Sequence, residues 1–365
     1  MGKRELLIII AFAVLAAIGY RLTAPPPEGP SRGFSLDTLA ENWRNRNTPG
    51  GRGHATVTSA GRIAVPADIA ELRLADLASV HVVGEGRDDI EWTLTVEATG
   101  PDDEAARRLG EGTSVRHDDL GRVMSVTVRV QGEGAQAGTL QLRVPSSLLL
   151  RIESARQTHV SGVAGVRLES LVGDVTLEQI AGMVDGAHRN GQLQINDAVD
   201  ISLTLMGSDA VVRRTHGAVS INARNGSTRI ESPTGATVVE VTGQELTITD
   251  AGGRVRATAV GGAVTIERPA ASVDVDARRA RVALLLSRAV TATVFATEGH
   301  VTLAVPAADA VRLDIVSESG SIDASAITLA AVVTDGDSVL TSGDEGATRV
   351  AIRGQRSSIV ISPGK

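Results

Sequence analysis

The side chains best suited to chemistry lie in one short run of the C-terminal half. Asp274, Asp276 and Arg278 alternate with small apolar residues, and Arg279 and Arg281 follow directly. Successive side chains of a β-strand point to opposite faces, so the three alternating polar groups are expected together on an outer face. Carboxylates and basic groups on one face are used by polysaccharide lyases and hydrolases built on parallel β-helices. The run is therefore a candidate surface patch for carbohydrate chemistry.

A solvated outer face is the simpler interpretation of the same run. Glycan and single-stranded nucleic-acid sites commonly use aromatic side chains as stacking platforms. The chain has only three Phe, two Trp and one Tyr, and Phe295 is the single aromatic residue after Trp92. This deficit weakens both functions, and we assign no catalytic residue.

Metal and cofactor sites are not indicated either. The seven histidines have no metal-ligand spacing and lie at positions 54, 81, 117, 159, 188, 216 and 300. His188, His216 and His300 fall beside repeat corners, where we expect solvated side chains. Asp335-Gly336-Asp337 lacks the further oxygens and the closing Glu of an EF-hand, which favours a polar turn. We expect no cofactor, no metal and no enzymatic activity.

Composition narrows the class of protein further. The chain has no cysteine, which excludes disulfides, thiolate metal sites and Cys nucleophiles. Its net charge is −7, and basic residues are in excess only before about residue 53, so the folded part is acidic and unsuited to nucleic acid. With 2% aromatic residues, the core must consist of Val, Ile, Leu and Ala, as in stacked short strands.

A Gly-punctuated repeat spans about residues 151–362. Glycines that precede an alternating apolar pair recur from Gly165 to Gly262, 97 residues in eleven steps of about 8.8. Typical units are Gly173-Asp-Val-Thr-Leu177 and Gly262-Ala-Val-Thr-Ile266. Each unit predicts one short strand with its third and fifth side chains inward and glycine at a cramped or left-handed corner. Such strands must stack, which predicts a β-solenoid, with a β-sandwich as the alternative.

The sequence pattern of residues 54–150 predicts a smaller β-rich domain with one helix. Short alternating runs indicate strands. They are His54–Thr58, Arg62–Val65, Glu71–Leu74, Ser79–Val83, Ile90–Ala98, Arg122–Val130 and Thr139–Val144. Pro101 and three following acidic residues suit a helix N-terminus, and Gly110 suits its end.

The N-terminus predicts export. Basic residues precede the apolar run Leu6–Tyr20. A helix rises about 1.5 Å per residue, so this run is short for a membrane span. It predicts either a thin membrane anchor over residues 1–24 or a cleaved signal peptide. Residues 25–53 form a Pro/Gly/Arg-rich linker, with a short amphipathic helix after Ser35 that lies at a bilayer surface or against the first β domain. We expect a single-pass protein of the cytoplasmic membrane with its bulk extracytoplasmic, periplasmic in a Gram-negative cell.

The order of these parts resembles the bacterial putative-adhesin β-solenoid domains, also called toast-rack domains. The resemblance covers about residues 60–362. It rests on Gly61–Pro66, the helix in the first β domain, Leu142–Pro145, the Gly-x-Val-x-Ile/Leu units, and the closing Ala347–Ile352 and Ser358–Ile361. It implies an envelope location, adhesion-like or scaffold roles and, in some cases, a link to envelope stress. It supplies no catalytic residues, and this chain departs from it by weaker glycine spacing after about residue 270.

The leading hypothesis is a non-catalytic, envelope-anchored scaffold or adhesin-like module. Its expected partners are the inner membrane, through the N-terminal helix, and unidentified envelope proteins, which could pair with an exposed final strand at the open end of the solenoid. A carbohydrate-active enzyme using the Asp274, Asp276 and Arg278 face, and a self-polymerising structural protein, remain the alternatives.

Overall fold

The computed structural model describes residues 53–130, 136–306, 311–327, 329, 331–334 and 336–364. The expected anchor over 1–24, the linker before Gly53 and the short helix after Ser35 lie outside these ranges. Within the ranges, we find no helix long and apolar enough to cross a bilayer. The described chain is almost entirely strand and turn, with one α-helix, which confirms the all-β class.

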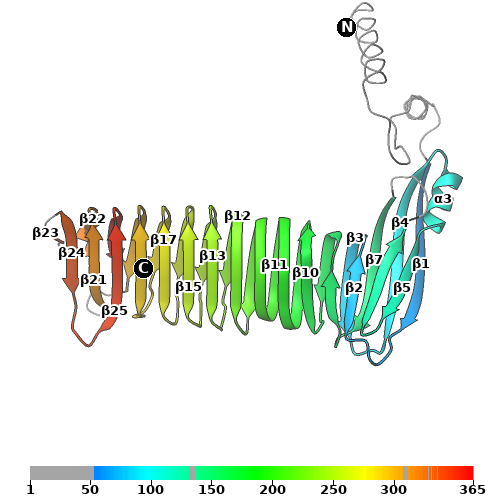
Figure 1. Ribbon diagram of the computed structural model, residues 1–365, viewed down its shortest axis with the longest axis horizontal. Helices are drawn as coiled ribbons and strands as arrows, with labels where there is room; N and C mark the ends of the chain where they lie inside the picture. The colour runs from blue at the N-terminus through cyan, green and yellow to red at the C-terminus, as the bar shows by residue number, and fades with distance from the viewer. Residues whose placement is uncertain are drawn as a thin grey trace, which may run out of the picture. The chain divides into compact units, whose positions relative to one another are not determined.

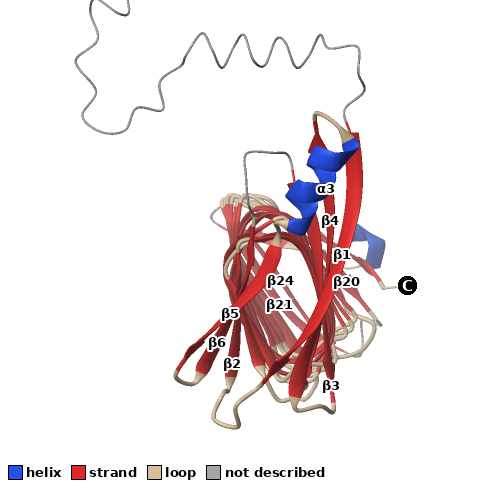
Figure 2. Cartoon of the chain, turned by 90° about the vertical axis from the view of Figure 1, so that its right-hand side faces the viewer, coloured by secondary structure: helices blue, strands red, loops and turns tan. Residues whose placement is uncertain are grey.

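Strands in the middle of the repeat region stack at a step of 18 residues, and the step becomes 19 from β17 (Val273–Arg278) onward. Each pairs in parallel with the strand one step further on, as Val239 does with Ala257 and Ala257 with Val275. Alternate strands form two facing layers, and one rung consists of one strand from each layer (Figures 1 and 2). The 8.8-residue glycine spacing is therefore half of one rung.

The strand bounds follow this arrangement. The first layer includes β13 (Thr237–Thr242), β15 (Val255–Val260), β17 (Val273–Arg278) and β19 (Ala292–Thr297). The second layer includes β14 (Glu245–Thr249), β16 (Ala263–Glu267), β18 (Arg281–Leu285) and β20 (His300–Val305). Before them, β10 (Gly165–Val172) leads into β11 (Asp174–Thr215) and β12 (Val219–Glu231), which bend from one layer into the other.

Inward side chains of the two layers form the core. Val264 and Ile266 are 1% and 0% exposed, and Val219 and Ile221, the same positions of an earlier unit, are equally buried. The prediction that the third and fifth residues of each unit point inward is confirmed for these units. Full burial of one such side chain contributes roughly 1.5–3 kcal/mol relative to leaving it exposed, so repeated aliphatic pairs can stabilise the stack without aromatic residues.

The corner from the first layer to the second needs a left-handed backbone. Gly243 and Gly261 adopt φ values of 66° and 72° there. In later rungs the same corner is taken by Arg279, Glu298 and Arg356, at 51°, 55° and 52°. A residue with a Cβ adopts this conformation at a cost of about 1–2 kcal/mol. Asn225 takes the equivalent corner of an earlier rung at 54°, so the left-handed corner is retained along the stack with and without glycine.

At the N-terminal end, the order of rungs in space differs from the order in sequence. The rung of β2 (Glu71–Ala75) and β3 (Leu77–Glu85) lies between two rungs that follow it in the chain. One of these is β6 (Val123–Arg129) with β7 (Gln136–Pro145), and the other is β8 (Leu149–Ile152) with β9 (Ala155–Ser161). The strands of residues 54–150 thus continue the stack directly, and a domain boundary at residue 150 stays a prediction.

Beyond these rungs, antiparallel strands and a helix end the stack. β1 (Gly53–Ala64) pairs with β4 (Asp89–Gly100), β4 pairs with β7, and β5 (Ser114–Leu120) pairs with β6. The helix α3 (Asp103–Glu111) lies against β1 and β4 (Figure 2). It begins after the N-cap Asp102 and continues one residue beyond Gly110, so the predicted helix is confirmed and its end is corrected. The two strands predicted within residues 54–65 are one, and β5 was not predicted.

The C-terminal end shows the same inversion. β25 (Thr348–Gln355) and β26 (Ser358–Pro363) insert between the rung of β19 and β20 and the rung of β21 (Val311–Glu318) and β22 (Ser321–Asp323). The expectation of an exposed final strand is therefore wrong, because β26 is paired on both sides. Within the described residues, the outermost strands are β22 and the hairpin of β23 (Val332–Thr334) and β24 (Asp337–Ser342), with the 3-10 turn Ser325–Ile327 between β22 and β23.

Candidate functional site

The structure distributes the candidate patch over two layers. Asp274, Asp276 and Arg278 lie together on the outer face of β17, as their alternation predicts. Arg279 occupies the left-handed corner. Arg281 begins β18 in the second layer, so it does not share the face of the two carboxylates.

Both carboxylates have arginine neighbours. Arg254 donates two hydrogen bonds to Asp274, one of them from Nε to Oδ2 at 3.0 Å. Arg278 Nε lies 4.0 Å from Oδ1 of Asp276, and these two side chains are 69% and 52% exposed. Both hydrogen bonds end on the same carboxylate oxygen, so Asp274 is engaged in an ion pair with a neighbouring rung.

Pairs of the same kind join neighbouring rungs elsewhere. Arg167 Nε lies 2.9 Å from Asp185, and Arg268 Nε lies 2.7 Å from Asp250, in each case across one 18-residue step. The hydrogen bond with Asp185 raises the pKa of Arg167, and the hydrogen bond from Arg268 lowers the pKa of Asp250. Charged ladders along the outer surface thus act as ties between rungs.

His188 is a buried residue, and the expectation of a solvated turn histidine is wrong at this position. Its side chain is fully buried because residue 188 takes an inward position of β11, in register with the buried Leu171. Nε2 donates to the carbonyl oxygen of Gly173 at 2.7 Å, so Nδ1 of the neutral ring accepts from Ser208 Oγ at 2.9 Å. Burial lowers the pKa of His188. The ring therefore links three successive rungs.

The other candidate ligands remain structural. His216 pairs with Asp197 at 2.8 Å and is largely exposed, as expected, whereas His300 is half-buried and contacts Ser358 Oγ at 2.6 Å. In the acidic turn, Asp335 lies outside the described residues, and Asp337 accepts a hydrogen bond from the backbone of Ser319. Across the described ranges, no three His, Asp or Glu side chains are grouped so that they could hold a metal ion.

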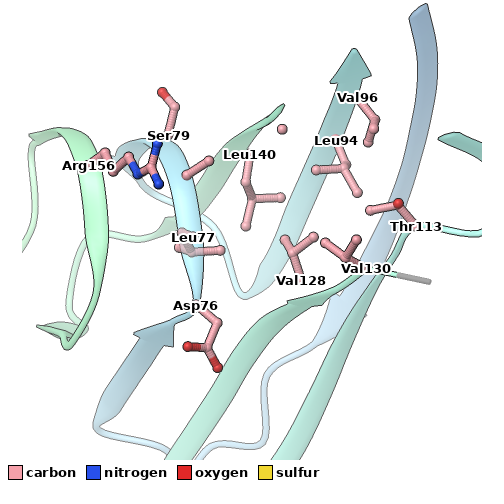
Figure 3. Close-up of a pocket in the computed structure, with 12 residues that line it drawn as sticks. Asp76, Leu77, Ser79, Leu94, Val96, Thr113, Val128, Val130, Leu140 and Arg156 are labelled. Carbon is pink, nitrogen blue, oxygen red and sulfur yellow. The ribbon is translucent and has the colours of Figure 1, made fainter. Parts of the chain in front are cut away.

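A hollow of about 310 Å³ lies near the N-terminal end of the stack (Figure 3). Asp76, Ser79 and Arg156 contribute polar groups to its lining, and Leu94 and Leu140 contribute apolar ones. Both leucines are only 1% exposed, whereas Val130, which also lines the hollow, is 49% exposed. We assign no ligand to it.

Phe295 is the functional candidate that the sequence analysis did not select. It is 53% exposed at an outer position of β19, whereas the other described aromatic residue, Trp92, packs against the core. The sequence contained the signal, because Phe295 alternates with Val294 and Ala296, which point inward. His188 had no such signal, because it stands beside a corner.

Comparison with known proteins finds similarity among solved structures alone. No family model and no curated protein matches the sequence. A putative adhesin from Parabacteroides distasonis is 12% identical with a TM-score of 0.33, over 68% of this chain and 97% of that chain. A putative adhesin from Parabacteroides merdae is 10% identical with a TM-score of 0.32, over 83% and 95%. A putative cell adhesion protein from Clostridium sporogenes is 8% identical with a TM-score of 0.21, over 85% and 100%.

The low identities and TM-scores limit the likeness to the class of fold, and no residue or function is transferred from these proteins. What the comparisons support is that this all-β chain is similar to bacterial proteins named as putative adhesins.

Proposed function

We propose that the chain is a non-catalytic, envelope-anchored β-solenoid that works as a scaffold or adhesin-like protein-binding module, of the kind linked in some cases to envelope stress. The apolar run Leu6–Tyr20 supports an anchor in the cytoplasmic membrane, and the acidic folded part supports a protein partner rather than nucleic acid.

The observation that carries this proposal is the use of outer charged groups as ties between rungs. Asp274, the best-placed candidate acid or base, is paired with Arg254, and Arg167 and Arg268 hold carboxylates in the same way. A carboxylate that already accepts hydrogen bonds from an arginine of a neighbouring rung has a structural role in the stack, which supports a non-catalytic interpretation of the outer face. The same pairs join neighbouring rungs along an extended outer surface, and stacked repeats offer such surfaces to partners.

Site-specific photo-crosslinking of the full chain in cells tests this function. A photoreactive residue would replace outer residues of each layer in turn, for example Thr297 and Thr265, with the buried Val275 as the matched inward control. We expect discrete adducts with envelope proteins from outer positions and none from position 275. An absence of adducts from both layers would contradict a binding module.

The enzymatic alternative is tested in parallel. Purified full chain would be incubated with acidic polysaccharides, alone and as the variants Asp274→Asn and Asp276→Asn. We expect no products from any of the three. Products that disappear in either variant would replace the proposed function with carbohydrate chemistry.

A further inference from the structure

The outer face of the first layer has an exposed aromatic residue among basic side chains. Phe295 stands directly between Asp276 on β17 and Arg353 on β25 in the pairing register. Val260, which is 36% exposed, precedes Arg278 on the same outer column. With Arg256, which begins the outer positions of β15, these six residues define the Phe295 patch.

An exposed phenylalanine is unusual here because the chain can fill its core without aromatic residues. Its outer neighbours on β19, Thr293 and Thr297, are short, and the phenylalanine itself is 53% exposed. Aromatic residues and arginine are enriched among the residues that dominate protein–protein binding energy. Phe295 is therefore a fitting anchor for a partner.

The charge of the patch indicates the chemistry of that partner. Asp274 is neutralised by Arg254, and Asp314, the carboxylate nearest to Arg353, is bonded by Arg349. Arg278 and Arg353 each reach a carboxylate only at 4.0 Å, and Arg256 has no ion-pair partner among the residues described. Arg353 thus stands directly opposite Phe295 and Arg278 lies on the adjacent strand, while Arg256 lies one strand further away, opposite Asp274. Among the described residues, Asp276 and, two strands from Phe295, Glu318 are the nearby carboxylates to which no arginine hydrogen-bonds, in a chain of net charge −7. Local charge of the opposite sign to the whole molecule favours a partner segment rich in Asp and Glu.

We propose that the Phe295 patch docks an acidic segment of a partner protein, with the phenylalanine ring as its apolar anchor. This inference rests on the proposed function and adds the place and the chemistry of binding. Arg278 and Arg353 supply bidentate hydrogen bonds to carboxylates of the partner.

The test uses the full chain in cells, with a photoreactive residue at Thr297, which pairs with Arg278. We expect an adduct whose crosslinked partner peptide is rich in Asp and Glu. Its yield should fall about tenfold in Phe295→Ala and in the double variant Arg278→Glu with Arg353→Glu, since loss of such anchors costs roughly 1–2 kcal/mol or more. Arg116→Glu on β5, exposed and distant along the stack, is the matched control and should leave the yield unchanged.

Other outcomes overturn the inference in distinguishable ways. An adduct that survives both sets of substitutions, or a crosslinked peptide without acidic residues, refutes the docking chemistry. An adduct with a second copy of the chain replaces the partner by self-association. Adducts from Thr265 in the second layer but none from Thr297 refute the patch and leave the proposed function standing, whereas no adduct from either layer removes both.

Discussion

Replacing His188 with alanine should destabilise the stack strongly although the residue lies in no candidate site. The substitution removes hydrogen bonds of 2.7 Å to Gly173 and 2.9 Å to Ser208. Each buried hydrogen bond contributes about 1 kcal/mol, and a carbonyl left without its partner costs a further 1–3 kcal/mol or so. The space left by a fully buried ring adds roughly 1–2 kcal/mol. Together these contributions give an expected loss of roughly 4–7 kcal/mol in the free energy of unfolding.

Protonation of the same ring should weaken the fold at low pH. Because burial lowers the pKa of His188 in the folded state below its ordinary 6.5, the unfolded chain binds the proton first as the pH falls. Stability from the neutral ring is complete above about pH 6.5 and is lost as the pH falls from there toward the folded-state pKa, by up to about 1.4 kcal/mol per pH unit. The hydrogen bond to Gly173 and, to a smaller extent, the nearby carboxylate of Asp174 favour the charged ring and reduce this loss without reversing it.

Hydrogen exchange and chemical denaturation can measure both effects. Amides of residues 173–208 should exchange faster in His188→Ala than in the unchanged protein, and His188→Gln should flatten the fall in stability between pH 7 and pH 5. His216→Ala is the control: its exposed pair with Asp197 should contribute less than about 1 kcal/mol. Equal losses in His188→Ala and His216→Ala, or identical pH profiles with and without His188, would refute the reasoning.

Three further predictions follow from the stacking. Gly235→Ala should lower the melting temperature clearly, because its new Cβ would lie 2.1 Å from a carbonyl oxygen of the preceding rung, whereas Gly346→Ala, with open space around it, should not. Truncation before residue 343 should expose the rung of β19 and β20 to rapid proteolysis, because β25 and β26 lie against that rung. A fragment as protease-resistant as the full chain would contradict the insertion of β25 and β26 beside β19 and β20. Arg268→Ala should lower the free energy of unfolding by less than about 1 kcal/mol at pH 7, because the pair with Asp250 is exposed. The depressed pKa of Asp250 supplies stability that is lost as the pH falls below the ordinary value of 3.8, so the variant should lose part of the acid sensitivity below pH 4. An unchanged acid denaturation curve would contradict this.

The placement of single side chains was predictable where the pattern is local. The alternation around Asp274 and Asp276 placed both on one outer face, and the same rule would have placed Phe295 there. Arg281 was grouped with them because it is close in sequence, but the corner at Arg279 turns the chain into the other layer. Whether an outer carboxylate is free or paired depends on the neighbouring rung, as Arg254 and Asp274 show across 20 residues.

The sequence by itself determined the all-β class, the inward aliphatic pairs and the repeating corners, because an alternation of period two and a left-handed turn are set by residues next to each other in the chain. Only the tertiary structure decided the order of the rungs at both ends and the burial of His188. Contacts such as that between His300 and Ser358 join residues 58 positions apart, and no local pattern distinguishes them from pairing in sequence order. The inserted final rung is stabilised by neighbours on both sides at once, and that stabilisation exists only when the layers have assembled.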